Sequence, residues 1–224
     1  MTGINTAHAV NIAPDGLHGD LVVPERATGI ILFAHGSGSS RHSPRNRYVA
    51  SVFQQGGLAT LLLDLLTAAE EQADLDSGHL RFDIGLLAER VLEATDWLVR
   101  EPATRGLQIG YFGASTGAGA ALVAAAERPS LVRAVVSRGG RPDLAGSALG
   151  RVQAPTLLIV GGDDCQVIKL NRQALAELRC EKEISIVPGA THLFEEQETL
   201  EQVAKLARNW FERYLKGRVV HGDA

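Results

Sequence analysis

The chain has few of the residues that would tie its fold to a disulfide, a metal ion or a membrane. Its two cysteines, Cys165 and Cys180, stand neither in a C-x-x-C pair nor beside a histidine at a zinc-ligand spacing. We expect two free thiols and no metal site. No apolar run approaches the roughly 20 residues that a bilayer-spanning helix needs, and the first residues show no basic leader followed by an apolar stretch. These absences predict a cytoplasmic protein that does not enter a membrane.

Clustered positive charge is also missing. The formal net charge is −4 and no basic run occurs, which argues against nucleic acid as the main partner, because phosphate binding needs grouped Lys and Arg. The patterns G-x-x-x-x-G-K-[ST] and H-E-x-x-H are absent, and neither glycine cluster completes G-x-G-x-x-G after an expected strand. We therefore expect a small-molecule substrate and no cofactor. No feature of the sequence indicates an oligomeric state.

What is present suits one well-packed domain. A chain of 224 residues, 45% of them hydrophobic, can bury a large core without a disulfide or a metal. No repeat, low-complexity tract or linker rich in Pro, Gly or Ser divides it. The expected organisation is a single domain over residues 1–224, with a frayed tail at 217–224.

Short apolar runs alternate with stretches of helical spacing. A continuous apolar run is typical of a strand that is covered on both faces. Alternating strands and helices imply right-handed crossovers and a mainly parallel sheet with helices on both faces. The expected strands are 29–34, 59–65, 107–112, 132–137, 156–161 and 184–189, and the expected helices are 45–55, 82–100, 115–127, 168–178 and 200–215.

Two further segments have a local pattern. Residues 7–12 and 19–24 flank the turn-forming Pro14-Asp15-Gly16, which predicts an antiparallel hairpin at one edge of the sheet. Residues 67–79 are acidic and show no periodicity. We expect them to form a surface loop that borders whatever site lies above the sheet.

The segment Gly113-Ala114-Ser115-Thr116-Gly117 fits the pattern G-x-S-x-G. It directly follows an expected strand and directly precedes an Ala-rich expected helix, so Ser115 falls at a strand-to-helix turn. Small neighbours allow the tight bend that exposes the serine hydroxyl. Without this context, a turn that only caps a helix would be the better explanation of the pattern. With it, Ser115 is the candidate nucleophile.

A serine hydroxyl needs a base to take its proton and an acid to hold that base. His192 follows the expected strand 184–189, and Asp163 and Asp164 follow the expected strand 156–161. The chain order of serine, acid and histidine is that of α/β-hydrolases. We favour Asp164 over its neighbour, because the G-x-x-D spacing from Gly161 puts it at the loop tip and leaves Asp163 to face solvent.

An ester-cleaving serine also needs two donors for the oxyanion. The Thr116 amide stands at the expected helix N-terminus, where free N–H groups favour negative charge. The glycine-rich loop His35-Gly36-Ser37-Gly38 offers the second donor, for which we expect the Ser37 N–H. A plain flexible loop is the alternative. We expect His35 to shape this loop through hydrogen bonds.

Together these residues resemble the dienelactone hydrolase branch of the α/β-hydrolase superfamily over nearly the whole chain. The resemblance lies in FAHGSGSS, GYFGASTGAGAAL, VSRGG, LLIVGGDD and VPGATHLFEE. It implies an α/β-hydrolase fold with about eight strands, no lid domain, and cofactor-free hydrolysis of an ester or lactone. By position, Ser115 matches the nucleophile, Asp164 the acid and His192 the base, while Ser37 and Thr116 match the oxyanion donors. The founding members use cysteine as nucleophile, so the serine here favours general carboxylesterase activity over dienelactone hydrolysis.

Several arginines follow strand ends near these residues. Arg41, Arg45 and Arg47 follow the glycine-rich loop, and Arg138 and Arg141 flank Gly139-Gly140. Arg41, Arg45 and Arg138 are candidates for binding an anionic substrate, since a guanidinium can bind a carboxylate with two hydrogen bonds. The alternative is that they form surface salt bridges with the acidic segment 70–76.

The sequence therefore predicts a serine hydrolase that cleaves a small carboxylic ester or lactone through an acyl-enzyme. Two alternatives stay open. One is a non-catalytic binding module on a hydrolase scaffold, since fold does not fix function. The other is an acyltransferase that uses the same triad.

Overall fold

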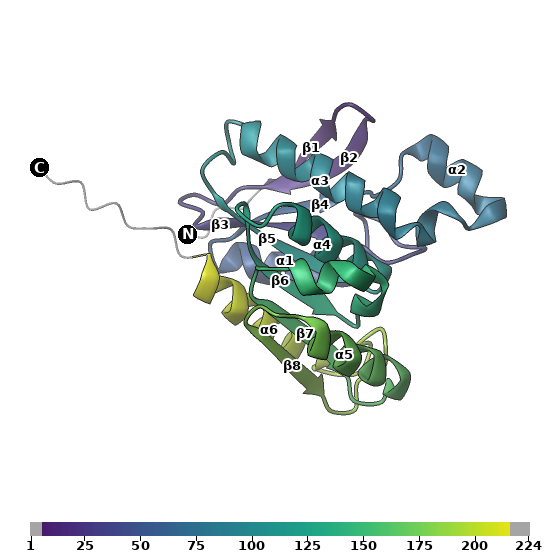
Figure 1. Ribbon diagram of the computed structural model, residues 1–224. Helices are drawn as coiled ribbons and strands as arrows, with labels where there is room; N and C mark the ends of the chain where they lie inside the picture. The colour runs from purple at the N-terminus through teal and green to yellow at the C-terminus, as the bar shows by residue number, and fades with distance from the viewer. Residues whose placement is uncertain (1–5, 216–224) are drawn as a thin grey trace, which may run out of the picture.

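The computed structural model describes residues 6–215, and its centre is an eight-stranded sheet (Figure 1). The order β1-β2-β4-β3-β5-β6-β7-β8 has β1 and β2 antiparallel to their neighbours and every later pairing parallel. This confirms the mostly parallel sheet and the hairpin at its edge. The strands are β1 (His8–Ile12), β2 (Leu17–Val22), β3 (Gly29–Ala34), β4 (Ala59–Leu63), β5 (Gln108–Ala114), β6 (Val132–Arg138), β7 (Thr156–Gly161) and β8 (Lys182–Val187).

Helices cover both faces of the sheet, as expected. Figure 1 shows α3, α4 and α5 in front of the sheet and α1 and α6 behind it. The helices are α1 (Pro44–Gln55), α2 (Ala68–Ser77), α3 (Ile84–Arg100), α4 (Thr116–Glu127), α5 (Cys165–Glu177) and α6 (Thr199–Tyr214), with 3-10 helices η1 (Leu80–Phe82) and η2 (Pro142–Arg151). In residues 6–215 no separate lid domain covers the sheet.

The central strands are apolar throughout because each face packs against helices. All six residues of β3 are buried. Ile30 and Leu32 belong to the core under α3 and α4, whereas Ile31 and Phe33 belong to the core under α1 and α6. Burial of each such side chain contributes about 1.5–3 kcal/mol, so two cores hold the central strands in place. The prediction of strands covered on both faces is confirmed for β3 and β7.

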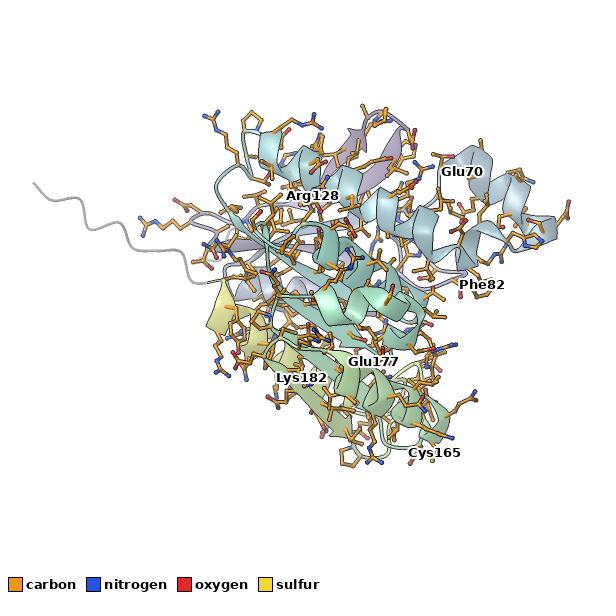
Figure 2. The ribbon with its side chains drawn as sticks, in the orientation of Figure 1. Glu70, Phe82, Arg128, Cys165, Glu177 and Lys182 are labelled. Atoms are coloured by element: carbon orange, nitrogen blue, oxygen red, sulfur yellow. The ribbon has the colours of Figure 1, made fainter. Side chains whose placement is uncertain are left out.

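The expectation of a loop at 67–79 is wrong, because residues 68–77 form helix α2. Thr67 and Glu70 form a capping box at its start (Glu70 is labelled in Figure 2), and Gly78 ends it in the left-handed conformation with φ 62°. Asp74, only 1% exposed, accepts hydrogen bonds from Leu80 and from the Arg81 guanidinium. These contacts stabilise a short helix whose side-chain pattern lacks an apolar stripe.

Strand β8 differs from its prediction in another way. It begins at Lys182 and most of it is exposed or half-buried, whereas the apolar run 184–189 predicted a covered strand. The reason is its position: within the part of the chain that the structure describes, β8 pairs only with β7 and forms the edge of the sheet. The tail predicted at 217–224 lies outside the described residues. Between residues 6 and 215, no helix has the length and apolarity to cross a membrane.

Candidate active site

Ser115 occupies a strained turn between β5 and α4. Its backbone has φ 49° and ψ −123°, a region that costs a non-glycine residue about 1–3 kcal/mol. The two glycines of the motif permit the bend. A Cβ on Gly113 would lie 2.4 Å from the Ala118 Cα, and one on Gly117 would lie 2.3 Å from the Ala34 carbonyl oxygen. The pattern G-x-S-x-G thus has its expected strand-turn-helix context.

Backbone contacts on both sides hold this turn. The Ser115 N–H donates to the Arg138 carbonyl at 3.4 Å, and the Ser115 carbonyl accepts from the Arg141 N–H at 3.0 Å. On the other side, a Cβ on Gly36 would lie 2.9 Å from the Ser115 Cβ. Ser115 therefore sits between the loop after β3 and the end of β6, and it remains half-exposed.

Asp164 and His192, 28 positions apart in the chain, form a hydrogen-bonded pair. His192 Nδ1 lies 2.8 Å from Asp164 Oδ2, while Asp164 Oδ1 accepts from the Val167 N–H at 3.3 Å and begins α5. Asp163 is exposed. The structure thus pairs the histidine with Asp164 and not with Asp163, while the role of Asp164 as the catalytic acid stays a prediction. An Nδ1–H donated to this carboxylate leaves Nε2 as the basic nitrogen.

The backbone clamps the aspartate loop against the histidine loop. The Gly162 N–H donates to the Val187 carbonyl at 2.8 Å, and the Asp163 N–H donates to the Ala190 carbonyl at 3.0 Å. A Cβ on Gly161 would lie 2.4 Å from the Ala190 oxygen. Only a residue without a side chain allows this approach, which brings Asp164 within reach of His192.

Ser115 and His192 meet at the same end of β6. A Cβ on Gly139, the residue after β6, would lie 2.9 Å from the His192 carbonyl oxygen and 3.7 Å from Nδ1, and Ser115 bonds to the preceding residue, Arg138. No hydrogen bond links the Ser115 hydroxyl to the imidazole in the part of the chain described. Such bonds are often long before substrate binds, so the roles of nucleophile and base stay predictions.

Ser37 and Thr116, the expected oxyanion donors, touch each other. The Ser37 N–H donates to Thr116 Oγ1 at 2.9 Å, so its hydrogen points at a hydroxyl. The sequence did not indicate this contact. Thr116 is the first residue of α4, where the amide has no partner within the helix. The structure thus brings both residues beside Ser115, and their roles as donors stay predictions.

His35 shapes the loop after β3, as predicted. Its Nδ1 lies 2.9 Å from the Gly36 carbonyl, and its Nε2 accepts from the Leu65 N–H at 3.1 Å. The acceptor role requires the neutral ring. Burial lowers the pKa of His35, against the raising effects of the Gly36 carbonyl and of Asp64 and Glu71, and so favours that neutral form.

The arginines do not form a ring of free cations. Arg41 pairs with Asp64 and with Asp20, at 3.5 Å to the latter, and Arg45 pairs with Glu195 at 2.9 Å. Carboxylates therefore neutralise both guanidinium groups, and the prediction that Arg41 and Arg45 bind an anionic substrate stays a prediction. The alternative, salt bridges from these arginines to the acidic segment 70–76, is wrong, because their partners in residues 6–215 are Asp20, Asp64 and Glu195.

Arg138 has a different environment. It is buried, and its Nη2 donates to Asn46 Oδ1 at 3.1 Å, with the Phe194 ring centroid 5.9 Å away. Burial and the nearby charge of Arg45 lower the pKa of Arg138 to about 10. This side chain lies between α1 and the histidine loop, and its role in substrate binding stays a prediction.

A cavity of about 280 Å³ adjoins the loop after β3. Its far wall comes from α2 and η1, including Leu75 and Arg81. The sequence placed residues 67–79 beside the site, but as a loop and not as the helix that forms this wall. The signal was available in Thr67-x-x-Glu70, the capping-box pattern that marks a helix start. Elsewhere in residues 6–215, no group of three or more His, Cys, Asp or Glu could hold a metal ion.

A strained serine turn, an aspartate-histidine pair and a lid-free parallel sheet define an α/β-hydrolase. Comparison with known proteins narrows the class further. The profile of the dienelactone hydrolase family matches residues 20–216, and the chain belongs to this family. It is similar to the crystal structure of dienelactone hydrolase from Anabaena variabilis, with 63% identity, a TM-score of 0.92, and coverage of 96% of this chain and 99% of that one.

A second solved structure and two curated proteins are also similar to this chain. Est1E from Butyrivibrio proteoclasticus has a TM-score of 0.75 at 15% identity, covering 92% of this chain and 98% of its own, which shows the shared fold alone. Curated proteins from two strains of Mycobacterium tuberculosis are 60% identical over 204 residues, or 91% of this chain, and carry a provisional name as phosphoribosyl transferases. The chain spans only 45% of the length of these relatives.

Proposed function

We propose that this hydrolase cleaves small carboxylic esters or lactones through an acyl-enzyme on Ser115. The observation that carries the proposal is the Asp164–His192 hydrogen bond of 2.8 Å at the same end of β6 as the strained Ser115. An imidazole oriented by a carboxylate, at the same end of the sheet as a serine hydroxyl, is the arrangement that serine hydrolysis needs.

In the proposed reaction, His192 takes the Ser115 proton while the hydroxyl oxygen attacks the ester carbonyl. The negative charge that develops on the carbonyl oxygen lies at the α4 N-terminus, beside the Thr116 amide and Ser37. His192 then gives its proton to the departing alcohol oxygen. In the second half of the reaction, His192 takes a proton from water while the water oxygen attacks the carbonyl of the acyl-enzyme. His192 then returns the proton to Ser115 as the acid is released, and Asp164 stabilises the charged imidazole in both halves.

The name of the Mycobacterium tuberculosis relatives raises a second function, phosphoribosyl transfer. The chain matches under half of those proteins, so their name can rest on the part that has no counterpart here. Hydrolysis is supported by the site of this chain, whose strained serine and paired histidine have no use in a transfer that needs no covalent enzyme intermediate. Acyl transfer to an alcohol or amine stays an alternative with the same acyl-enzyme.

Chromogenic esters test the proposal. Wild type should hydrolyse p-nitrophenyl acetate and should be labelled by a fluorophosphonate probe, whereas Ser115→Ala should lose both properties. An undiminished rate in Ser115→Ala would remove Ser115 as nucleophile. Absence of labelling and turnover in wild type would favour a binding module. Faster release of nitrophenol with added alcohol, together with ester formation, would favour acyl transfer.

We propose a small-molecule substrate and a cytoplasmic site of action. The two free thiols, Cys165 and Cys180, support a reducing compartment, because oxidising compartments favour disulfides.

A further inference from the structure

In the tetrahedral intermediate of the proposed reaction, the acyl chain and the alcohol diverge from the carbon that is bonded to the Ser115 oxygen. Ser115 follows β5, with β3 and β4 on one side and β6 and β7 on the other. His192 lies on the β6 side, against Gly139. Because the imidazole must protonate the departing alcohol oxygen, the alcohol lies toward β6. The acyl chain therefore extends toward β3 and β4.

The cavity of about 280 Å³ lies on that acyl side. Its lining includes Gly36 and Ser37, and Gly36 packs directly against the Ser115 Cβ. It extends from there to Leu66, after β4, and to Leu75 of α2. A cavity of this volume suits a short acyl chain.

The walls favour an apolar chain without negative charge. Leu65, Leu66, Leu75 and Leu87 supply the apolar surface. The charged groups of the lining are Asp64, Glu71, Asp74 and Arg81. Arg81, the single cation among them, forms an ion pair with Asp74 at 2.6 Å, and Asp64 forms an ion pair with Arg41. Glu71 forms no ion pair in residues 6–215, so a carboxylate entering the cavity would meet negative charge without a free cation.

We infer that this cavity binds the acyl half of the substrate and selects an uncharged, apolar acyl chain over one that ends in a carboxylate. The inference rests on the proposed ester hydrolysis and names its substrate class. It also assigns a function to α2, because this helix supplies the wall that limits the acyl chain.

A bulky wall residue tests the location. Leu75 is 63% exposed, so Leu75→Trp should fold normally while its indole narrows the cavity. We expect kcat/KM for p-nitrophenyl hexanoate to fall about tenfold, the effect of a methylene or two in an apolar pocket, with p-nitrophenyl acetate changed less than twofold. The control is Val99→Trp, at an exposed position of α3 outside the cavity lining. It should change neither rate.

A second ester series separates the acyl half from the alcohol half. Acetate esters of alcohols of increasing length should respond equally in wild type and Leu75→Trp. If Leu75→Trp instead impaired the long alcohols and spared long acyl chains, the cavity would be the alcohol site and the inference would be overturned. The inference would also be overturned if Leu75→Trp left kcat/KM unchanged for both p-nitrophenyl hexanoate and p-nitrophenyl acetate.

A pair of esters with uncharged and charged acyl chains tests the selection against a carboxylate. Wild type should prefer p-nitrophenyl hexanoate to the p-nitrophenyl monoester of adipic acid, which carries a carboxylate at the chain end. Glu71→Gln should raise kcat/KM for the adipate about three- to tenfold, as expected for removing one nearby charge in a partly solvated site, and leave the hexanoate nearly unchanged. A wild type that prefers the adipate would contradict the inference. Turnover of p-nitrophenyl acetate and labelling of Ser115 would still support the proposed hydrolase.

A separate contact assigns a role to the Thr116 side chain. Thr116 Oγ1 accepts the Ser37 N–H at 2.9 Å, and its own hydrogen has no acceptor in the part of the chain described. The side chain is 4% exposed and stands on the residue after Ser115. We propose that the Thr116 hydroxyl donates to the oxyanion, polarised by the Ser37 amide behind it.

Thr116→Val distinguishes this arrangement from a direct Ser37 donor, because the two predict opposite changes. If the hydroxyl donates, kcat should fall about 100-fold or more with little change in KM, and Thr116→Ser should restore most of it. If the Ser37 amide donates directly, Thr116→Val frees that amide, and kcat should hold or rise. A fall in Thr116→Ser as large as in Thr116→Val would also overturn the proposal. Circular dichroism of each variant confirms folding.

Discussion

Asp164 binds His192 with one carboxylate oxygen and begins helix α5 with the other. Oδ2 lies 2.8 Å from His192 Nδ1, and Oδ1 accepts from the Val167 N–H at 3.3 Å. The helix cap limits the rotation of the carboxylate, so the direction of Oδ2 follows from the position of α5. The orientation of the proposed base is therefore set by secondary structure.

This relationship predicts that Asp164 and its neighbour Asp163 differ greatly in their effect on kcat. Asp164→Asn keeps a carbonyl oxygen for the helix cap but removes the charge that holds the Nδ1–H tautomer. We expect kcat for p-nitrophenyl acetate to fall about 10³- to 10⁴-fold. Asp163→Asn, at the exposed adjacent position, should change kcat less than twofold. The reverse ranking would make Asp163 the functional acid.

The strain at Ser115 predicts a gain in stability at the cost of activity. With φ 49° and ψ −123°, glycine adopts this backbone more easily than any residue with a Cβ. Ser115→Gly should therefore unfold in urea with a free energy about 1 kcal/mol higher than that of Ser115→Ala. Both variants lack the hydroxyl, so the comparison isolates the backbone. Equal stabilities would mean that the turn stores no strain.

The close packing of Gly117 predicts a severe effect of a single methyl group. A Cβ there would lie 2.3 Å from the Ala34 carbonyl oxygen, so β3 or the start of α4 must move. We expect Gly117→Ala to lower the free energy of unfolding by about 2 kcal/mol or more. Gly150→Ala is the control, because its Cβ would meet only Arg179 at 4.0 Å. Thermal unfolding of both variants measures the difference.

Asp74 predicts an acid-sensitive α2. Burial opposes its charge, but hydrogen bonds from the Arg81 side chain and from the Leu80 and Arg81 amides outweigh burial and lower its pKa from 3.8 to about 2. A lowered pKa means that the folded state binds the proton less readily, so this contribution to stability is complete above about pH 4 and disappears toward pH 2. In wild type the urea midpoint should fall over this window.

Asp74→Asn should be less stable than wild type near pH 5, and its urea midpoint should fall less steeply between pH 4 and pH 2. Asp76→Asn, at the exposed position two residues on, serves as the control and should follow wild type. Parallel pH profiles for Asp74→Asn and wild type would show that Asp74 does not govern the acid response.

The sequence by itself determined the alternating strands and helices, the turn at Ser115 and the choice of Asp164 and His192. These features depend on local patterns: apolar runs, glycines around a serine, and residues that follow strand ends. Because parallel strands end at one edge of the sheet, such patterns also predict which side chains meet there. Helix α2 was equally local, since its capping box is visible in Thr67 and Glu70.

Only the tertiary structure decided the partners of side chains that reach across the fold. The ion pairs of Arg41 with Asp64 and of Arg45 with Glu195 join positions 23 and 150 residues apart, and the Ser37–Thr116 bond spans 79 residues. Nothing in the spacing of these residues sets which groups neutralise one another. The cavity beside Ser37 likewise exists because α2 packs opposite the loop after β3, and its charge depends on pairings that form only when the chain is folded.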